Sequence, residues 1–151
     1  MHFATHGILD GTNPLYSHVV LSQSTANSNE DGLLEAREIM KMDLNADLAV
    51  LSACETARGR ISSGEGVIGM SWAPFVAGVP TSMVSQWSVE SNSTAKLMID
   101  FHRALLSLNK NSDHVRGSAE ALRQAALTML KTLGYSHPLF WAGFIIIGDA
   151  W

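Results

Sequence analysis

The sequence contains little cysteine, few charged residues and no long hydrophobic run. Cys54 is the one cysteine among 151 residues, so the chain can form neither an internal disulfide bond nor a multi-cysteine zinc site. A single thiol is typical of a reducing compartment, and we therefore expect a cytoplasmic protein. No apolar stretch reaches the length of a membrane span, and the first residues lack the basic and apolar regions of a signal peptide.

Charged residues are also few, and neither the acidic nor the basic ones form a cluster in the sequence. The chain carries 10 Lys and Arg against 14 Asp and Glu, and the basic residues are scattered along it. This distribution disfavours a nucleic-acid partner bound through a basic patch, and we expect no membrane partner either. With 46% apolar residues, the chain is long enough to bury one core without disulfide or metal support.

Alternating short apolar runs and amphipathic stretches predict an α/β fold with a mainly parallel sheet and helices on both faces. The run at residues 47–54 is continuous and apolar, which is typical of a central strand covered on both faces. Residues 23–31 are polar and predict a mobile loop. The other expected strands span residues 2–5, 17–22, 80–87 and 141–148, and the expected helices span residues 34–42, 66–77, 93–108 and 118–133, with Ser93 and Thr94 capping the third helix.

Two residues of catalytic type follow two of the expected strands. In open α/β sheets, sites gather at the carboxyl ends of strands, and His6 and Cys54 both fall there. An imidazole can take the proton of a thiol or hold the thiolate in an ion pair, and Gly7 leaves room for a substrate carbonyl. The backbone N–H groups of Gly7 and Cys54 could then form an oxyanion hole. The pattern is equally that of a buried, inert cysteine, so both interpretations stay open at this point.

Five short segments along the chain carry a family resemblance. They are HFATHG at 2–7, LSACET at 51–56, GEG at 64–66, SQWSV at 85–89 and HPLFWA at 137–142. In this order they resemble the CHAT family of caspase- and separase-like cysteine peptidases. The resemblance implies a caspase-like three-layer α/β/α sandwich and hydrolysis of a protein substrate through a thioester acyl-enzyme. By position, His6 is the base or ion-pair partner, Cys54 is the nucleophile, and Gly7 with the Cys54 amide forms the oxyanion hole.

The resemblance also implies where substrate binds. Related peptidases add an extended substrate strand along the segment that corresponds to residues 85–87, so Ser85 and Trp87 are predicted substrate-binding residues. Family members commonly carry an Asp four residues after that Trp, facing a basic P1 side chain. This sequence has Ser91 there, preceded by Glu90. Either Glu90 supplies the negative charge or the preference for P1 Lys or Arg is lost.

The extent of the resemblance bears on domain organisation. It begins at the histidine segment, so residues 1–151 are expected to be a CHAT-like peptidase domain that lacks its N-terminal strands and helices. An upstream regulatory or repeat domain is then expected, and a strand at an open sheet edge could pair with it or with a second copy. Two alternatives stay open: a non-catalytic caspase-like interaction or signalling module, and acyl transfer to a small molecule by the same dyad.

Other motifs are assigned structural roles. Residues 64–69 read G-x-G-x-x-G, but a polar stretch separates them from the preceding strand, so they predict a loop and helix start in which Gly69 allows close packing. His2 shares a strand face with His6 without a third ligand nearby and is expected to be a packed or hydrogen-bonded strand residue. We expect no cofactor and no metal.

Overall fold

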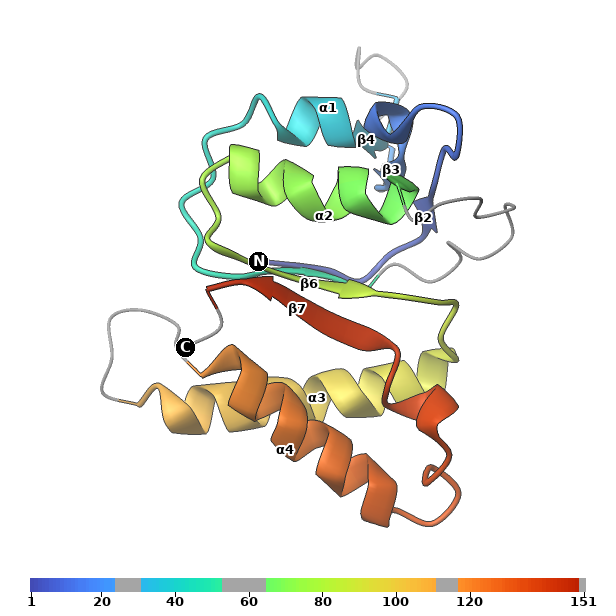
Figure 1. The fold of residues 1–151 in the computed structure, drawn as a ribbon, viewed down its shortest axis with the longest axis vertical. Helices are drawn as coiled ribbons and strands as arrows, with labels where there is room; N and C mark the ends of the chain where they lie inside the picture. Colours follow the sequence, from blue (N-terminus) through green and yellow to red (C-terminus); the bar gives the residue numbers. More distant parts are fainter. Residues whose placement is uncertain (24–30, 53–64, 111–116, 150–151) are drawn as a thin grey trace.

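The computed structural model describes residues 1–23, 31–52, 65–110 and 117–149, with the side chains of residues 65–68 left aside (Figure 1). Cys54 and most of the predicted mobile loop at 23–31 lie outside these residues. The described part is a mixed α/β structure around a four-stranded sheet, which confirms the predicted class. The strands run in the order β1, β5, β6, β7, with bounds His2–Phe3, Ala49–Leu51, Thr81–Ser85 and Phe144–Gly148.

The main sheet is mostly parallel. β5 lies between β1 and β6 and pairs with both in parallel, and all three of its residues are buried. This confirms the central strand expected from the continuous apolar run. β7 pairs with β6 in antiparallel register, with Ser85 opposite Phe144. The strand predicted at 141–148 is shorter than expected, and it runs opposite to the other three strands of the sheet.

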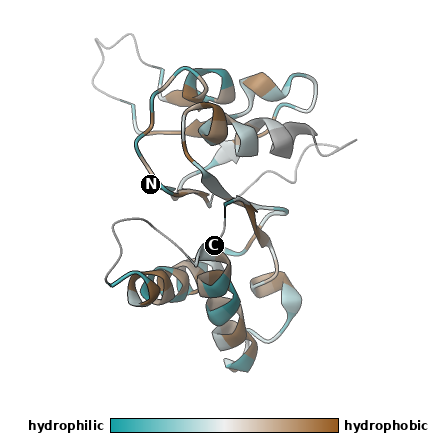
Figure 2. Ribbon diagram, turned by 60° about the vertical axis from the view of Figure 1, so that its left-hand side comes forward, coloured by the Kyte–Doolittle hydropathy of each residue, from teal (hydrophilic) through white to brown (hydrophobic). Residues whose placement is uncertain are grey.

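Helices cover both faces of this sheet. α2 (Glu65–Val76) covers one face, with the short α1 (Ala36–Ile39) packed on its outer side, and α3 (Ser91–Leu108) and α4 (Ser118–Lys131) pack together on the other face (Figure 1). α3 and α4 are amphipathic, with hydrophilic and hydrophobic residues on different sides (Figure 2).

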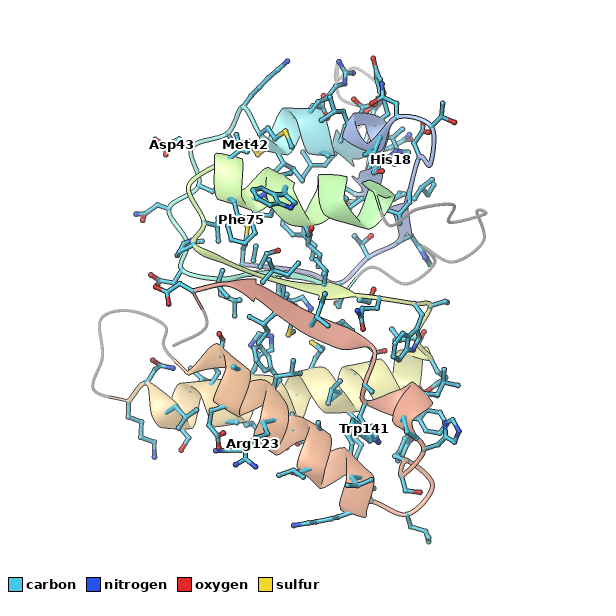
Figure 3. All side chains as sticks on the ribbon, in the orientation of Figure 1. His18, Met42, Asp43, Phe75, Arg123 and Trp141 are labelled. Carbon is cyan, nitrogen blue, oxygen red and sulfur yellow. The ribbon has the colours of Figure 1, made fainter. Side chains whose placement is uncertain are left out.

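Side chains fill the space between the sheet and both helical layers (Figure 3). Alternation along the strands divides them between the faces: Val50 and Met83 belong to the core under α3 and α4, whereas Phe3 packs into the core on the α2 side. His2, adjacent to Phe3, therefore points to the α3 face.

A second, three-stranded antiparallel sheet was not expected from the sequence. It contains β2 (Gly7–Ile8), β3 (His18–Val20) and β4 (Leu33–Glu35). The helix predicted at 34–42 is wrong in its first part, because Leu33–Glu35 pairs with β3 and only Ala36–Ile39 is helical. Strands of two or three residues give too few alternations for the pattern to be recognised.

The start of α3 also differs from the prediction. Glu90, rather than Ser93 and Thr94, is the N-cap residue: its carboxylate accepts the backbone N–H groups of Asn92 and Ser93 at 2.9 and 2.7 Å. The hydroxyls of Ser93 and Thr94 instead donate back to the Glu90 carbonyl. The helix begins two residues earlier than predicted because a carboxylate is an equally good acceptor for these N–H groups.

Candidate functional site

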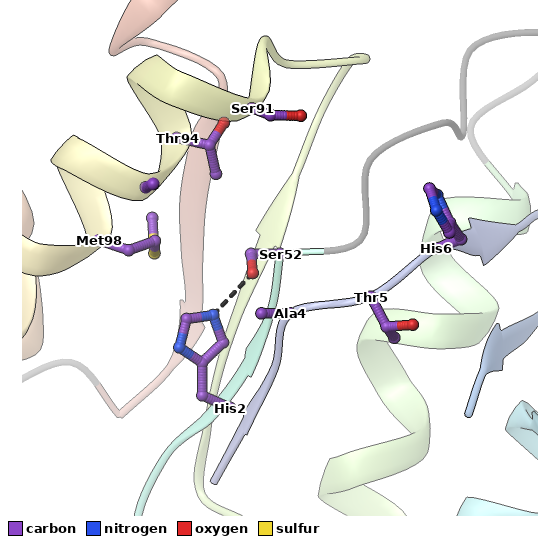
Figure 4. Close-up of a pocket in the computed structure, with 9 residues that line it drawn as sticks. His2, Ala4, Thr5, His6, Ser52, Ser91, Thr94 and Met98 are labelled. Carbon is purple, nitrogen blue, oxygen red and sulfur yellow. Dashed lines mark hydrogen bonds between the residues drawn. The ribbon is translucent and has the colours of Figure 1, made fainter. Parts of the chain in front are cut away.

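A cavity of about 290 Å³ lies where the carboxyl ends of β1 and β5 meet the first turns of α3 (Figure 4). We call it the α3 pocket. Its volume is at the lower end of the range for small-molecule sites, which suits a single side chain rather than a large ligand. It is lined by His2, Ala4, Thr5, His6, Ser52, Ser91, Thr94, Ala95 and Met98.

The described residues that line the α3 pocket are Ser, Thr, Ala, Met and His, without an acidic side chain. Hydroxyl groups come from Ser52, Ser91 and Thr94, and apolar surface comes from Ala95 and Met98. Among the described residues that line it, none is an Asp or a Glu. The described part of the lining therefore offers hydrogen bonds and apolar contact, and it holds no carboxylate to pair with a cationic group.

The predicted base, His6, lines the α3 pocket and is exposed. It lies between β1 and β2, and two hydrogen bonds to β3 fix its backbone: the Val20 N–H donates to the His6 carbonyl at 2.8 Å, and the Thr5 hydroxyl donates to the Val20 carbonyl. A fixed backbone with an exposed ring leaves the imidazole free to act at the mouth of the pocket.

Gly7, predicted to donate to an oxyanion, follows directly in β2 and is buried. It lies opposite Val19 in the antiparallel pair. Because the neighbouring pair, His6 and Val20, is hydrogen-bonded, Gly7 occupies a non-hydrogen-bonded position of the ladder. Its N–H therefore points away from β3 and is not used in that pairing.

The predicted nucleophile, Cys54, lies outside the described residues. Ser52, two positions before it, is the last described residue of that segment, and only 7% of its surface is exposed. Ser52 lines the pocket beside His2 (Figure 4). The described structure thus brings His6 and the carboxyl end of β5 to the same pocket.

His2 is a hydrogen-bonded strand residue, as predicted, and its partners extend to α3. Its Nε2 lies 2.6 Å from Ser52 Oγ and its Nδ1 lies 3.1 Å from His102 Nε2. Burial lowers the pKa of both rings, and the electrostatic effect of His102 lowers that of His2 further. Both imidazoles are therefore neutral at pH 7. Sequence reasoning missed His102, because nothing local indicates a contact between residues 100 positions apart.

Two of the predicted substrate-binding residues are placed within the sheet and core. Ser85 is buried in β6 opposite Phe144, and the Gln86 N–H donates to the Gly143 carbonyl at 2.7 Å. Trp87 packs against the core under α3, close to Gly143. Neither lines the α3 pocket. β7 thus already pairs along Ser85 and Gln86, and substrate binding by Ser85 and Trp87 stays a prediction.

Glu90 and Ser91, the two residues considered for the charge that would face a P1 side chain, lie in different places. Both carboxylate oxygens of Glu90 accept backbone N–H groups of α3, which lowers its pKa and keeps it ionised, and Glu90 does not line the pocket. Ser91 does line it. The position at which family members carry Asp is therefore the one at the pocket, and here it carries a hydroxyl.

Within the described residues, no cluster of three or more His, Cys, Asp or Glu side chains could hold a metal ion. Over the same residues, no helix is long and apolar enough to cross a membrane.

Comparison with known proteins agrees with the resemblance. A family model described as the CHAT domain matches residues 1–149. Tetratricopeptide repeat protein 28 of Mus musculus is 29% identical over 117 residues, which make up 78% of this chain and 4% of that protein. The Homo sapiens protein of the same name gives the same identity and coverage. The chain therefore spans about 4% of the length of these curated relatives.

Proposed function

The chain belongs to the CHAT domain family, which is related to caspase-like peptidases, and from this we propose that it is a cysteine endopeptidase with His6 and Cys54 as its dyad. The observation that carries the proposal is the α3 pocket, which His6 lines together with Ser52, two residues before Cys54. Both elements reach one cavity at the carboxyl ends of parallel strands, where α/β sheets hold their sites.

The reaction proceeds by acyl transfer to sulfur. The Cys54 thiol gives its proton to His6, and the thiolate attacks the substrate carbonyl carbon. The N–H groups of Gly7 and Cys54 stabilise the negative charge on the carbonyl oxygen; the ladder position of Gly7, with its N–H turned away from β3, supports this role. His6 then protonates the leaving amine as the C–N bond breaks. Water, deprotonated by His6, hydrolyses the thioester and releases the acid.

The α3 pocket receives the side chain that precedes the cleaved bond. Its lining supports an uncharged residue there, because Ser91 replaces the usual Asp and the Glu90 carboxylate is used to cap α3. A Lys or Arg buried in this pocket would find no charged partner among the described lining residues, which is costly.

The chain also fits into a longer architecture. The relatives are named as tetratricopeptide repeat proteins, and we propose that a repeat domain adjoins this domain and regulates it. β1 ends the described main sheet and can pair with a further strand of the same protein or with a second copy.

A second candidate function is a non-catalytic interaction module. Two observations favour it: the loss of the acidic residue at Ser91, and relatives that are named for their repeats rather than for an activity. It differs from the first in requiring no reactive thiol.

The test is a cleavage-site profile on a denatured proteome with the native full-length protein and its Cys54→Ala variant. We expect cleavage that depends on Cys54, after uncharged side chains. Ser91→Asp should shift cleavage toward Lys and Arg, whereas Glu90→Gln should leave the profile unchanged. Cleavage after Lys or Arg that is lost in Glu90→Gln would overturn the assignment of the pocket. The same profile for wild type and Cys54→Ala, with no labelling of the wild type by a thiol-directed acyl electrophile, would favour the interaction module.

A further inference from the structure

Three side chains from three elements form a continuous hydrogen-bonded set beside the α3 pocket. His102 of α3 contacts His2 of β1, and His2 contacts Ser52 at the end of β5. The rings of His2 and His102 also contact each other, with centroids 5.2 Å apart. We call the set the histidine network. It is the one place within the described residues where side-chain hydrogen bonds of α3 reach β1 and β5.

The number of available protons decides which atom donates in each hydrogen bond of the network. Ser52 has a single hydroxyl proton and two neighbours, His2 Nε2 at 2.6 Å and the Phe3 carbonyl at 3.3 Å. A carbonyl can only accept, so all contacts are satisfied when Ser52 donates to Phe3, His2 donates from Nε2 to Ser52, and His102 donates from Nε2 to His2 Nδ1. The opposite direction leaves the contact between Ser52 and Phe3 without a proton.

The strand geometry makes this network a support for the reaction centre. His2 and Ser52 point to the same face because the parallel pairing sets His2 opposite Val50, one alternation from Ser52. His6 follows His2 by four residues, and Cys54 follows Ser52 by two. The hydrogen bond between His2 and Ser52 thus joins the two strands immediately before both members of the proposed dyad, and His102 fixes its orientation from the helix layer.

We propose that His102, His2 and Ser52 are positioning residues, which hold the carboxyl ends of β1 and β5 in the register that lets His6 activate the Cys54 thiol. This inference rests on the proposed function. A displacement of about 1 Å between reacting groups is enough to cost two orders of magnitude in rate, so a network that fixes this spacing has a direct effect on reactivity. The three residues need not touch substrate to act in this way.

The network itself is tested by histidine NMR on the full protein, without any activity. We expect His2 to be protonated at Nε2 in the neutral state. In His102→Phe the His2 pKa should rise, because a neighbouring positive charge is removed. The titratable group that faces His2 and influences this titration is His102 from α3. Identical His2 tautomer and titration in wild type, Ser52→Ala and His102→Phe would overturn the network.

The positioning role is tested through the thiol. Cys54 is the single cysteine of these 151 residues, so alkylation by iodoacetamide is followed on the peptide that contains Cys54. We expect Ser52→Ala and His102→Phe to raise the pH midpoint of alkylation and to lower its rate at pH 6 about threefold to tenfold, as one weakened ion pair predicts. Ser52→Thr, which keeps the hydroxyl, should restore most of the rate. Ser107→Ala, at an exposed position of the same helix as His102, is the matched control and should react like the wild type.

The outcomes separate this inference from the proposed function. A wild-type thiol with a lowered pKa that is unchanged in Ser52→Ala and His102→Phe would overturn the positioning role alone. An ordinary thiol pKa of about 8.5 in the wild type would overturn the proposed function, and the positioning role with it. Loss of reactivity in Ser52→Ala without recovery in Ser52→Thr would show that packing rather than the hydroxyl matters, and would also overturn the positioning role.

Discussion

The two faces of the main sheet differ in what fills them. Under α3 and α4 the core contains large side chains such as Phe101, Met83 and Met129, and the α3 pocket and the histidine network lie on this same face. On the α2 face the core is smaller and includes Val19, Ala36, Ala73 and Ala77.

The difference follows from how each helix approaches the structure around it. α2 comes close to the turn at Pro14 at Gly69, where an added Cβ would lie 2.7 Å from Pro14. α3 contributes large side chains such as Leu97 and Phe101 to its core, and its first turns line the α3 pocket. The face with the larger core thus also carries the candidate site. Three predictions test this comparison.

The largest effect is expected in the core under α3. Phe101 is fully buried, and Phe101→Ala should reduce the free energy of unfolding by about 3–5 kcal/mol, because it removes apolar contact and leaves a cavity. Denaturant unfolding of the variant measures this. Leu106→Ala on the same helix, at a side chain 73% exposed, is the control and should change the value by less than about 0.5 kcal/mol. Equal effects at the two positions would contradict the assignment of this core.

An intermediate effect is expected on the α2 face. A Cβ at Gly69 would lie 2.7 Å from both the Cβ and the carbonyl oxygen of Pro14. Gly-to-Ala in a helix ordinarily stabilises, but here backbone must move, so we expect Gly69→Ala to lower the unfolding free energy by about 1–3 kcal/mol. The matched control is Val76→Ala on an exposed side of α2, with a change below about 0.5 kcal/mol. A more stable Gly69→Ala protein would show that the approach to Pro14 yields easily.

The smallest effect is expected when pH is lowered, because His2 and His102 on the α3 face then become protonated. The pKa values of His2 and His102 lie below their ordinary value of 6.5 in the folded protein, so the unfolded chain binds more protons between the folded and unfolded values. Their contribution to stability is therefore complete above pH 6.5 and is lost as pH falls through the lowered values. Thermal unfolding between pH 8 and pH 5 should show a shallower decline in His102→Phe than in the wild type. The same slope in both proteins would mean that the two rings do not titrate as a pair.

Particular elements show what could be predicted. β5 could be predicted because a continuous apolar run is stable as a strand only when helices bury both of its faces. α4 was predicted almost to its ends, because Ala121, Ala125 and Met129 repeat at helical spacing and are all buried. The small sheet was missed because its strands are too short to show a period, and the capping role of Glu90 was missed because Ser and Thr nearby offered an equally good local signal.

The candidate site divides in the same way. His6 and Gly7 could be selected from their position after a strand, since the end of a parallel strand is where a site forms. The composition of the α3 pocket could not, because it depends on which turn of α3 faces β1. Ser91 appeared in the sequence only as a departure from a family pattern, whereas the structure gives it a place in the pocket wall.

By itself the sequence determined the α/β class, the buried central strand and the placement of catalytic residue types at strand ends, because these follow from local periodicity and from the polar breaks that end apolar runs. Tertiary structure decided the direction of β7, the covering of Ser85 by that strand, and the meeting of His2 with Ser52 and His102. These features depend on how separate elements pack. Burial of apolar faces fixes which elements meet, and only their packed geometry brings two imidazoles 100 residues apart within hydrogen-bond distance.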